Sequence, residues 1–424
     1  MASSQHAHPD VGPDLGPAEN WFGVFRAGQV FAHLSRGFTV EASRQYLAHC
    51  DPHNVVAGNP ALARRLGLLP PGPGPTHDGV PVGLVAPEKV FQDAIAQSVG
   101  PVTFRVQQNQ GYDECWFLAP VLEGTELEME TRVLATYVRD KSPDAGTVPI
   151  ETRGYLRRPD GGRVLAHYHW RTPDVRRHPA APALEPTPIP VVTPQTLSWA
   201  DCEIPVHRDL PRGYLGRHGR LVEDLEVGLV LDGFEPRGVT SAEGWFLVTS
   251  TGNIAEMHYD VGKGPLIVGG ATIARALTQL RPHCPLAWPV GIPHVGHTAP
   301  VYPSDRLADV DGIARFAPAA IPGHFVLRTS MQVAEIFDVG REDGQLVRLL
   351  ATTYMGVTEE GRTVLAQQRK DFILGLTRPE HGLHRGHPER FHRPRVVQRD
   401  GATEVAVLEM ELLWFVPSAR AMAA

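Results

Sequence analysis

The sequence predicts an α+β fold of two tandem units, each an antiparallel sheet wrapped around one central helix. Three observations predict it: a long proline-rich segment divides the chain, the halves share short motifs in the same order, and each half shows one long helix pattern followed by several strand patterns. With 424 residues, of which 42% are hydrophobic, the chain can build two cores. Its 42 glycines and 39 prolines disfavour a helical bundle.

Proline and glycine content sets the predicted domain boundaries. Residues 1–19 are polar and rich in both, and we expect a flexible N-terminus there. Residues 20–171 are expected to form the first unit and residues 221–424 the second. The segment 172–220 is interpreted as a linker, because its dense prolines exclude a helix or a central strand. Residues 378–394, which carry four histidines among Pro, Gly and Arg, are interpreted as a surface insertion of the second unit.

Short motifs recur in the two halves and indicate an internal duplication. The matching pairs are Arg36-Gly-Phe-Thr39 with Arg237-Gly-Val-Thr240 and Ala119-Pro-Val with Ala299-Pro-Val. Each Arg-Gly-x-Thr motif precedes a short helix pattern that ends in a polar turn, at Asp51 in the first half and at Asn253 in the second. Matches in the same order predict a duplication of about 180–200 residues.

Within each half, a short capped helix, a longer helix and a set of strands are predicted in that order. Thr240-Ser-Ala-Glu243 fits the capping box, in which two side chains satisfy free backbone N–H groups. The longer helix is predicted over Pro87–Val99 in the first half and from about Gly270 in the second, because apolar residues recur there every three or four positions. The predicted strands are Glu126–Asp140, Val148–Arg157, Val164–Trp170, Phe325–Phe337, Leu346–Tyr354, Thr363–Leu374 and Thr403–Val416.

Several strand and turn motifs together carry a family resemblance. They are Asn20-Trp-Phe-Gly-Val-Phe-Arg-Ala-Gly28-Gln, Asn109-Gln-Gly-Tyr112, Asn253-Ile-Ala-Glu-Met-His258, Gly269-Gly270 and Val407-Leu-Glu-Met-Glu-Leu-Leu-Trp414. In these motifs the chain resembles the MaoC-like hotdog hydratases, duplicated into a double hotdog, and within them the mesaconyl-CoA hydratase (β-methylmalyl-CoA dehydratase) group. The likeness covers most of residues 20–171 and 221–417.

The resemblance implies a double-hotdog fold and a hydro-lyase activity. The implied reaction is the reversible hydration or dehydration of an enoyl thioester with a short branched or dicarboxylic acyl group. The thioester would be that of coenzyme A or of an acyl-carrier protein, so coenzyme A enters as part of the substrate. Neither a metal nor a redox cofactor is implied. Association of two chains into a homodimer is compatible with the sequence.

The second half carries the expected catalytic residues. In the family, an Asp and a His five residues later flank the substrate double bond, and this chain has Asn253 and His258 at that spacing. The resemblance implies that His258 is the acid/base group, because an amide cannot accept a proton as a carboxylate can, and that Asn253 orients water through its oxygen. Gly269 and Gly270 precede the second long helix. Backbone N–H groups there would stabilise the charge that gathers on the thioester oxygen.

Three further residues are expected near the substrate. The first half has Val56 where the family has His, so this half is interpreted as degenerate and as shaping the acyl or pantetheine pocket. In the alternative, Asp51 reaches the site as a second carboxylate. Arg275 is the preferred candidate for the diphosphate of coenzyme A or an acyl carboxylate. Tyr112 either packs with its hydroxyl hydrogen-bonded or touches the substrate. Weaker candidates for the same anions are Arg281, Arg306 and Arg328.

Composition and spacing argue against other classes of protein. The formal net charge of -7 argues against nucleic-acid binding through phosphate neutralisation. No run of 18 or more apolar residues and no signal-peptide pattern is present, so we expect no membrane span and a cytoplasmic location. The four cysteines form no CxxC pair, which argues against a disulfide framework or a zinc site. The histidines His381, His384 and His387 lie among helix breakers and are interpreted as a solvated loop rather than a metal site.

Two other functions stay open from the sequence. The first is a thioesterase on the same fold, which would attack the carbonyl carbon instead of the double bond. It would need a carboxylate facing the thioester, and Asn253 speaks against one. The second is a non-catalytic subunit that binds acyl thioesters, a view supported by Val56 in the first half and by Ala271 after the glycine pair.

Overall fold

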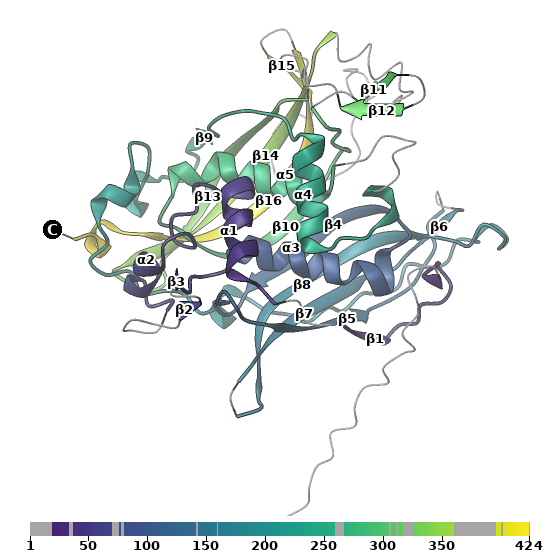
Figure 1. The fold of residues 1–424 in the computed structure, drawn as a ribbon, viewed down its shortest axis with the longest axis horizontal. Coiled ribbons are helices and arrows are strands. Elements are labelled where there is room, and N and C mark those ends of the chain that lie inside the picture. Colours follow the sequence, from purple (N-terminus) through teal and green to yellow (C-terminus); the bar gives the residue numbers. More distant parts are fainter. Residues whose placement is uncertain are drawn as a thin grey trace, which may run out of the picture.

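One twelve-stranded antiparallel sheet runs through both halves of the chain (Figure 1). The computed structural model describes residues 19–33, 37–69, 76–77, 80–140, 143–158, 160–258, 267–304, 307–310, 313–316, 325–359, 396–399 and 402–423. In sheet order the main strands are β1 (Val30–His33), β5 (Leu127–Val133), β7 (Ile150–Arg157), β8 (Arg163–Arg176), β4 (Val106–Phe117), β10 (Trp288–His297), β16 (Ala402–Pro417), β14 (Gly344–Val357), β13 (Leu327–Phe337) and β9 (Val230–Asp232). At the sides, β6 (Ala145–Thr147) pairs with β8 and β15 (Val396–Arg399) with β16. Two-stranded ribbons are formed by β2 (Thr76–His77) with β3 (Val80–Pro81) and by β11 (Leu307–Val310) with β12 (Ile313–Phe316).

The order of strands is symmetric about the pair β4–β10. Going outward from β4 the sheet runs β8, β7, β5 and β1, and going outward from β10 it runs β16, β14, β13 and β9. The central pair is antiparallel, with Tyr112 opposite Val295 and Trp116 opposite Gly291. A Cβ atom on Gly111 would lie 2.6 Å from the carbonyl oxygen of Val295, so only glycine fits where the two strands cross.

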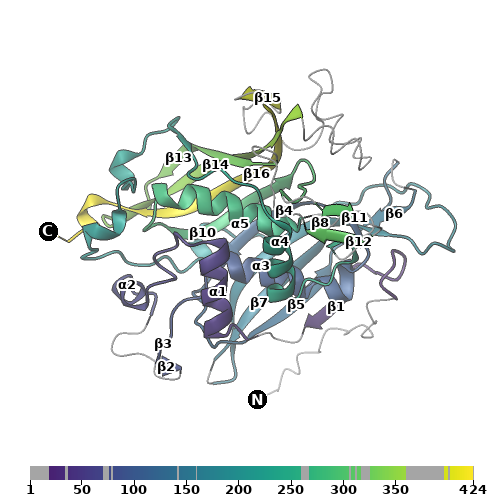
Figure 2. The ribbon, with the colours of Figure 1, turned by 45° about the horizontal axis from the view of Figure 1, so that its top comes forward.

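The helices lie together on one face of this sheet (Figures 1 and 2). The long helix α3 (Pro87–Gln97) packs on β7 and β8, and α5 (Gly269–Leu280) packs on β13. The helices α1 (Val40–Cys50) and α4 (Ser241–Thr251) pack against each other and against these two. The remaining elements are α2 (Pro60–Arg65), the π-helical turn η2 (Val99–Thr103), and the 3-10 turns η3 (Trp199–Asp201), η4 (Arg212–Leu215), η5 (Val222–Asp224), η6 (Glu256–His258), η7 (Arg281–His283) and η8 (Ala419–Ala421).

The central helix α3 is enclosed although its sequence is half polar. All of its residues from Pro87 to Ala96 are buried, including two acids, a lysine and a glutamine. Its buried charges have partners, as burial requires: Lys89 Nζ lies 2.8 Å from Asp93 Oδ2 one turn later. The sheet therefore closes around a helix whose buried lysine is paired with an acid of the same helix.

A buried ion cluster links the two halves. The guanidinium of Arg281, on η7, lies 2.5 Å from Glu88 Oε1 on α3 and 3.2 Å from Asp51 Oδ2 at the end of α1. All three side chains are at most 2% exposed, and the guanidinium also lies over the ring of Trp414, 4.9 Å from its centre. Burial raises the pKa of Glu88, although Arg281 opposes the shift. One cation thus holds two carboxylates from the other half.

Most predicted elements are present. The helices expected over Pro87–Val99 and from Gly270 are α3 and α5, and Thr240 and Glu243 form both hydrogen bonds of the capping box at α4. Strand β8 ends at Arg176, so the sheet extends past the boundary expected at residue 171. The central strands β4 and β10 were not predicted. The strand expected over 363–374, the insertion 378–394 and residues 1–18 of the N-terminus lie outside the described residues.

No helix within the described ranges combines the length and the apolar character needed to cross a membrane. All four cysteines are free thiols, and two of them, Cys115 and Cys284, are buried.

The α+β class predicted from the sequence is confirmed, with one central helix and one half of the sheet in each copy.

Replacing Arg281 with methionine is expected to destabilise the fold by about 3–5 kcal/mol, because Asp51 and Glu88 would stay buried without their counter-charge. Urea unfolding measures the difference. The matched control is Arg420→Met, whose guanidinium is 70% exposed beside Glu342; this change should cost less than about 1 kcal/mol. Equal unfolding midpoints for the two variants would contradict a role of the cluster in joining the halves.

Stability is expected to fall as the pH drops from about 6.5 toward 3, because buried histidines stay neutral in the folded chain. Burial lowers the pKa of His207 to about 3, whereas an unfolded histidine titrates near 6.5. Below pH 6.5 the unfolded state therefore binds a proton that the folded state does not, and His207 alone should cost about 2 kcal/mol at pH 5.

Urea unfolding at pH 7 and pH 5 tests this expectation. In His207→Leu the difference between the two pH values should shrink by about 2 kcal/mol. The control is His178→Leu at an exposed position, which should leave the difference unchanged. A pH response that His207→Leu does not reduce would show that the ring is protonated in the folded state.

Candidate active site

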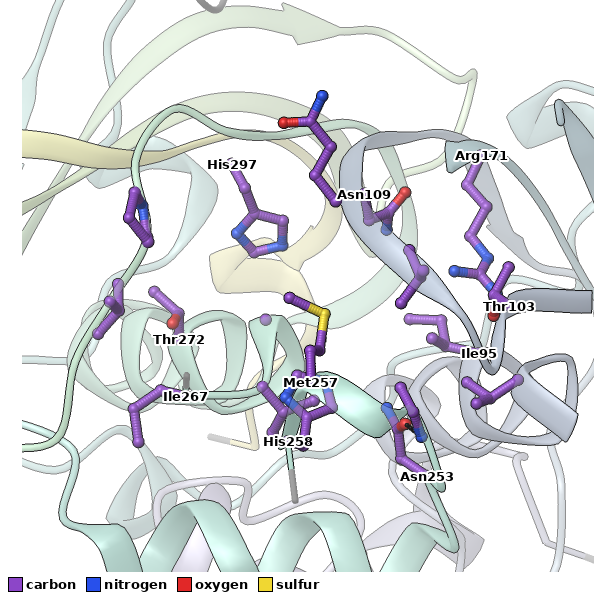
Figure 3. A pocket seen from close by; sticks show the side chains of 18 of the residues that line it. Ile95, Thr103, Asn109, Arg171, Asn253, Met257, His258, Ile267, Thr272 and His297 are labelled. Atoms are coloured by element: carbon purple, nitrogen blue, oxygen red, sulfur yellow. Dashed lines mark hydrogen bonds between the residues drawn. The ribbon is translucent and has the colours of Figure 1, made fainter. Parts of the chain in front are cut away.

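A cavity of about 340 Å³ lies between the two halves of the chain (Figure 3). The first half supplies the end of α3, the π-helical turn η2, the beginning of β4 and Arg171 of β8. The second half supplies the turn after α4, the 3-10 turn η6, the start of α5, the end of β10 and the segment Ala299–Val301. The Ala-Pro-Val motif that recurs in the sequence thus borders the cavity in its second copy. This volume suits a small acyl group, at the lower end of ligand pockets of about 300–1,000 Å³.

Asn253 and His258 both line the cavity, from one short turn. Helix α4 ends at Thr251, and Gly252 follows in the left-handed conformation (φ 70°) that reverses the chain. Asn253 Oδ1 then accepts a hydrogen bond from the backbone N–H of Ala255 at 3.1 Å, which fixes the amide against the turn. The 3-10 turn η6 carries the chain on to the half-buried His258. The spacing of five residues seen in the sequence therefore brings both side chains to one wall.

The start of α5 faces the same cavity. Its first residue, Gly269, lines the wall, and among the described residues no side chain caps the helix after the N-cap residue Val268. The first N–H groups of a helix have no acceptor within the helix, and the helix dipole adds partial positive charge there. A Cβ atom on residue 269 would lie 2.6 Å from Nε2 of His297. Because residue 269 is a glycine, the imidazole of His297 lies close to the backbone there, and the backbone itself borders the cavity.

Gly270 has a different environment from Gly269. It does not border the cavity, and a Cβ atom there would lie 3.2 Å from the amide carbon of Gln92. Gln92 Nε2 donates a hydrogen bond to the Gly270 carbonyl at 3.2 Å, so this glycine serves the close packing of α5 on α3. The glycine pair expected to act together is divided between the cavity and the helix contact.

His297 lines the cavity and was missed by the sequence reasoning. Figure 3 shows its ring pointing into the cavity, with Met257 on the side of His258. Burial lowers the pKa of His297 to about 4, so the ring is neutral near pH 7. Its Nε2 has no hydrogen-bond partner among the described residues. The one available signal was position, since His297 lies two residues before the repeated Ala299-Pro-Val segment, where the first half has Phe117.

Tyr112, on the central strand β4, forms part of the cavity wall. It is 5% exposed, packs edge-to-face on Phe91 at 5.1 Å, and lies 6.0 Å from His297 between ring centres. Burial raises the pKa of its hydroxyl, while the Arg171 charge and a hydrogen bond with Asn109 oppose the rise. The aromatic residue of the Asn-Gln-Gly-Tyr motif therefore meets the cavity as a neutral phenol.

Arg171 is the second cavity residue that the sequence reasoning missed. It is 3% exposed, and its Nη2 donates to Ser98 Oγ at 2.6 Å and to Thr103 Oγ1 at 2.9 Å. Among the described residues that line the cavity there is no aspartate or glutamate. The walls are therefore apolar and amide-rich, with histidines and one guanidinium.

Asp51 and Arg275, two residues expected to meet the substrate, lie elsewhere. Asp51 belongs to the ion cluster with Arg281 and does not border the cavity. Arg275 Nη2 lies 2.6 Å from Glu243 Oε1, an ion pair that ties α5 to α4. Neither residue borders the cavity, and a contact of either with the substrate stays a prediction. Of the weaker candidates, Arg281 is in the cluster, Arg328 pairs with Glu404 at 3.0 Å, and Arg306 lies outside the described residues.

At the equivalent positions, the first half has one residue whose side chain cannot carry a proton and one that cannot donate a backbone hydrogen bond. Val56, which stands where the second half has His258, is 1% exposed in the hydrophobic core. Helix α3 begins with Pro87 where α5 begins with Gly269. Proline has no N–H group, so the first half presents neither the imidazole nor the first backbone donor.

Within the part of the chain that the structure describes, no three His, Cys, Asp or Glu side chains come close enough to hold a metal ion. The histidines His381, His384 and His387 lie outside those residues, so their interpretation as a solvated loop stays a prediction.

Known proteins resemble this chain in sequence and in fold. No family model matches the chain. A mesaconyl-CoA hydratase from Cereibacter sphaeroides is 26% identical over 350 residues, which are 77% of this chain and 94% of that protein.

Two solved structures share the fold over nearly the whole length. A candidate MaoC domain dehydratase from Chloroflexus aurantiacus is 17% identical, with a TM-score of 0.68 over 96% of this chain and 99% of that one. A Mycobacterium tuberculosis protein described as a double hotdog is also 17% identical, with a TM-score of 0.57 over 94% and 98% of the two chains. The resemblance drawn from the sequence is therefore confirmed: the chain has the double-hotdog fold of MaoC-like proteins.

Proposed function

We propose that the chain is a hydro-lyase that adds water to, or removes it from, the double bond of an enoyl thioester. The observation that carries the proposal is the meeting of His258, Asn253 and the uncapped start of α5 in one cavity. An imidazole can move a proton, an amide oxygen can hold water, and helix N–H groups can receive an enolate oxygen. Similarity to a mesaconyl-CoA hydratase supports the same reaction.

In the direction of hydration, neutral His258 accepts a proton from water as the water oxygen bonds to the β-carbon. The electron pair of the double bond moves toward the thioester, and the negative charge gathers on its oxygen. The Gly269 N–H group at the start of α5 stabilises that charge. The protonated imidazole then returns the proton to the α-carbon, so one base serves both steps, as expected in a cavity whose described lining holds no carboxylate.

Asn253 and His297 have supporting roles in this reaction: the first orients water, and the second closes the cavity beside the start of α5. The amide of Asn253, held by Ala255, keeps a lone pair on its oxygen with which to orient the attacking water. His297 packs against Gly269 as a neutral ring and closes the cavity beside the helix start. Gly270 takes no part beyond holding α5 against α3.

The proposed substrate is a short branched or dicarboxylic enoyl thioester of coenzyme A, such as mesaconyl-CoA. The small cavity favours an acyl group of few carbons, and the mesaconyl-CoA hydratase similarity favours a C4–C5 dicarboxylic acid. The same acyl group on a carrier protein would present the same thioester to His258, so we extend the proposal to both carriers.

The wild-type protein is expected to consume the enoyl absorbance of mesaconyl-CoA or crotonyl-CoA without releasing a thiol. A thiol reagent in a parallel assay separates hydration from hydrolysis. Release of free coenzyme A in step with substrate loss would identify a thioesterase. No change with a panel of enoyl thioesters, together with binding of the same compounds, would favour a non-catalytic subunit.

The variant His258→Ala is expected to lower turnover by roughly 10²- to 10⁴-fold, because the proton carrier is lost. Its circular dichroism and urea midpoint should match those of the wild type, since the side chain is only half-buried. Asn253→Asp should keep activity, because a carboxylate also orients water. The exposed His178→Ala serves as the control and should be fully active. If His381→Ala were as damaging as His258→Ala, the exclusion of that histidine cluster would be wrong.

A further inference from the structure

Arg171 is a buried cation that reaches a cavity without a counter-charge. It lines the cavity from β8 and is 3% exposed. Its hydrogen-bond partners are the hydroxyls of Ser98 and Thr103, both bound through Nη2. Nε is buried without an acceptor among the described residues, and no ion pair joins the guanidinium to a described carboxylate.

The groups around this guanidinium are neutral. Burial lowers the pKa of His33 to about 4 and that of His169 well below its usual value, and the charge of Arg171 contributes to both shifts. Burial raises the pKa of Tyr112, which the Arg171 charge opposes, and its hydroxyl is a neutral phenol. A buried charge is costly unless it is paired, so this site is incomplete as it stands and fits an anion supplied by a ligand.

The Ser98 and Thr103 contacts also fix the direction of the guanidinium. Both hydroxyls come from the end of α3 and the π-helical turn η2, and π-helical turns often mark functional sites. With Nη2 held on the protein side by these two hydroxyls, Nη1 is the guanidinium nitrogen left to donate to a ligand. A carboxylate oxygen beside it would accept a charge-assisted hydrogen bond.

We propose that Arg171 binds the distal carboxylate of the acyl group and so selects dicarboxylic over monocarboxylic enoyl thioesters. This inference rests on the proposed function, whose reacting groups line the same cavity. In a coenzyme A thioester the pantetheine arm is uncharged and the phosphates lie at its far end. The acyl carboxylate is therefore the anion that a small buried cavity can receive.

The test compares two substrates that differ in one group. Fumaryl-CoA carries a carboxylate where crotonyl-CoA carries a methyl group on the same double bond. Wild type should prefer fumaryl-CoA in kcat/KM. Arg171→Gln should lower kcat/KM for fumaryl-CoA by roughly 30- to 1,000-fold and that for crotonyl-CoA by less than about 3-fold. Arg171→Lys should show a smaller loss, confined to fumaryl-CoA, because the charge stays but the guanidinium held by Ser98 and Thr103 is lost.

Two controls separate recognition from structure. Ser98→Ala removes a hydrogen bond of Arg171 but keeps its charge, and the preference for fumaryl-CoA should persist. Arg275→Gln removes another buried guanidinium outside the cavity, and any loss should be equal for both substrates. If Arg171→Gln does not fold, Arg171→Lys decides the question by the same ratio. A wild type without preference, or equal losses on both substrates, would overturn the inference.

A binding measurement keeps the inference distinct from the proposed reaction. Isothermal titration with succinyl-CoA and butyryl-CoA, which differ by the same carboxylate and methyl group, needs no turnover. Tighter binding of succinyl-CoA that disappears in Arg171→Gln would support carboxylate recognition even if no hydration were observed. Hydration of crotonyl-CoA with equal binding of both saturated thioesters would support the reaction and refute the role of Arg171.

Discussion

The antiparallel pairing of β4 with β10 is the contact on which the rest of the molecule depends. It joins two half-sheets into one, and it leaves the cavity between the copies with one wall from each. The close approach needs glycine at position 111, because a side chain would meet the Val295 carbonyl. Neither copy alone could enclose an acyl group, so the proposed site exists because two copies share one chain.

Two of the buried guanidinium groups, those of Arg281 and Arg171, have surroundings that differ in one respect. Arg281 has two carboxylates within hydrogen-bond distance and joins the halves. Arg171 has hydroxyl partners alone and opens onto the cavity. A structural ion pair is complete without a ligand, whereas a buried charge with only neutral partners is not. This contrast, more than the number of arginines, separates a residue that stabilises from one that recognises.

The sequence could predict the parts of the fold that have a local pattern. The helices α3 and α5 and the strand β16 show regular apolar spacing, and the Asn253–His258 turn has a fixed length. The strands β4 and β10 could not be predicted, because β4 opens with polar residues that line the cavity and β10 contains Pro289 and Pro293, with bulges that absorb them. His297 and Arg171 belong to no motif, since strand register alone brings them to the cavity. The adjacent glycines looked like one feature, but neighbouring helix residues point about 100° apart, so one faces the cavity and the other faces α3.

The two long helices begin with different residues, proline in α3 and glycine in α5, and this difference separates the two copies. Proline at the start of α3 has no backbone N–H group, so the donor that Gly269 offers at the start of α5 is missing there. To present the groups that we propose for the second copy, the first would need a residue other than proline at 87, an imidazole at 56 and release of Asp51 from Arg281. No single substitution would therefore make the two copies equivalent.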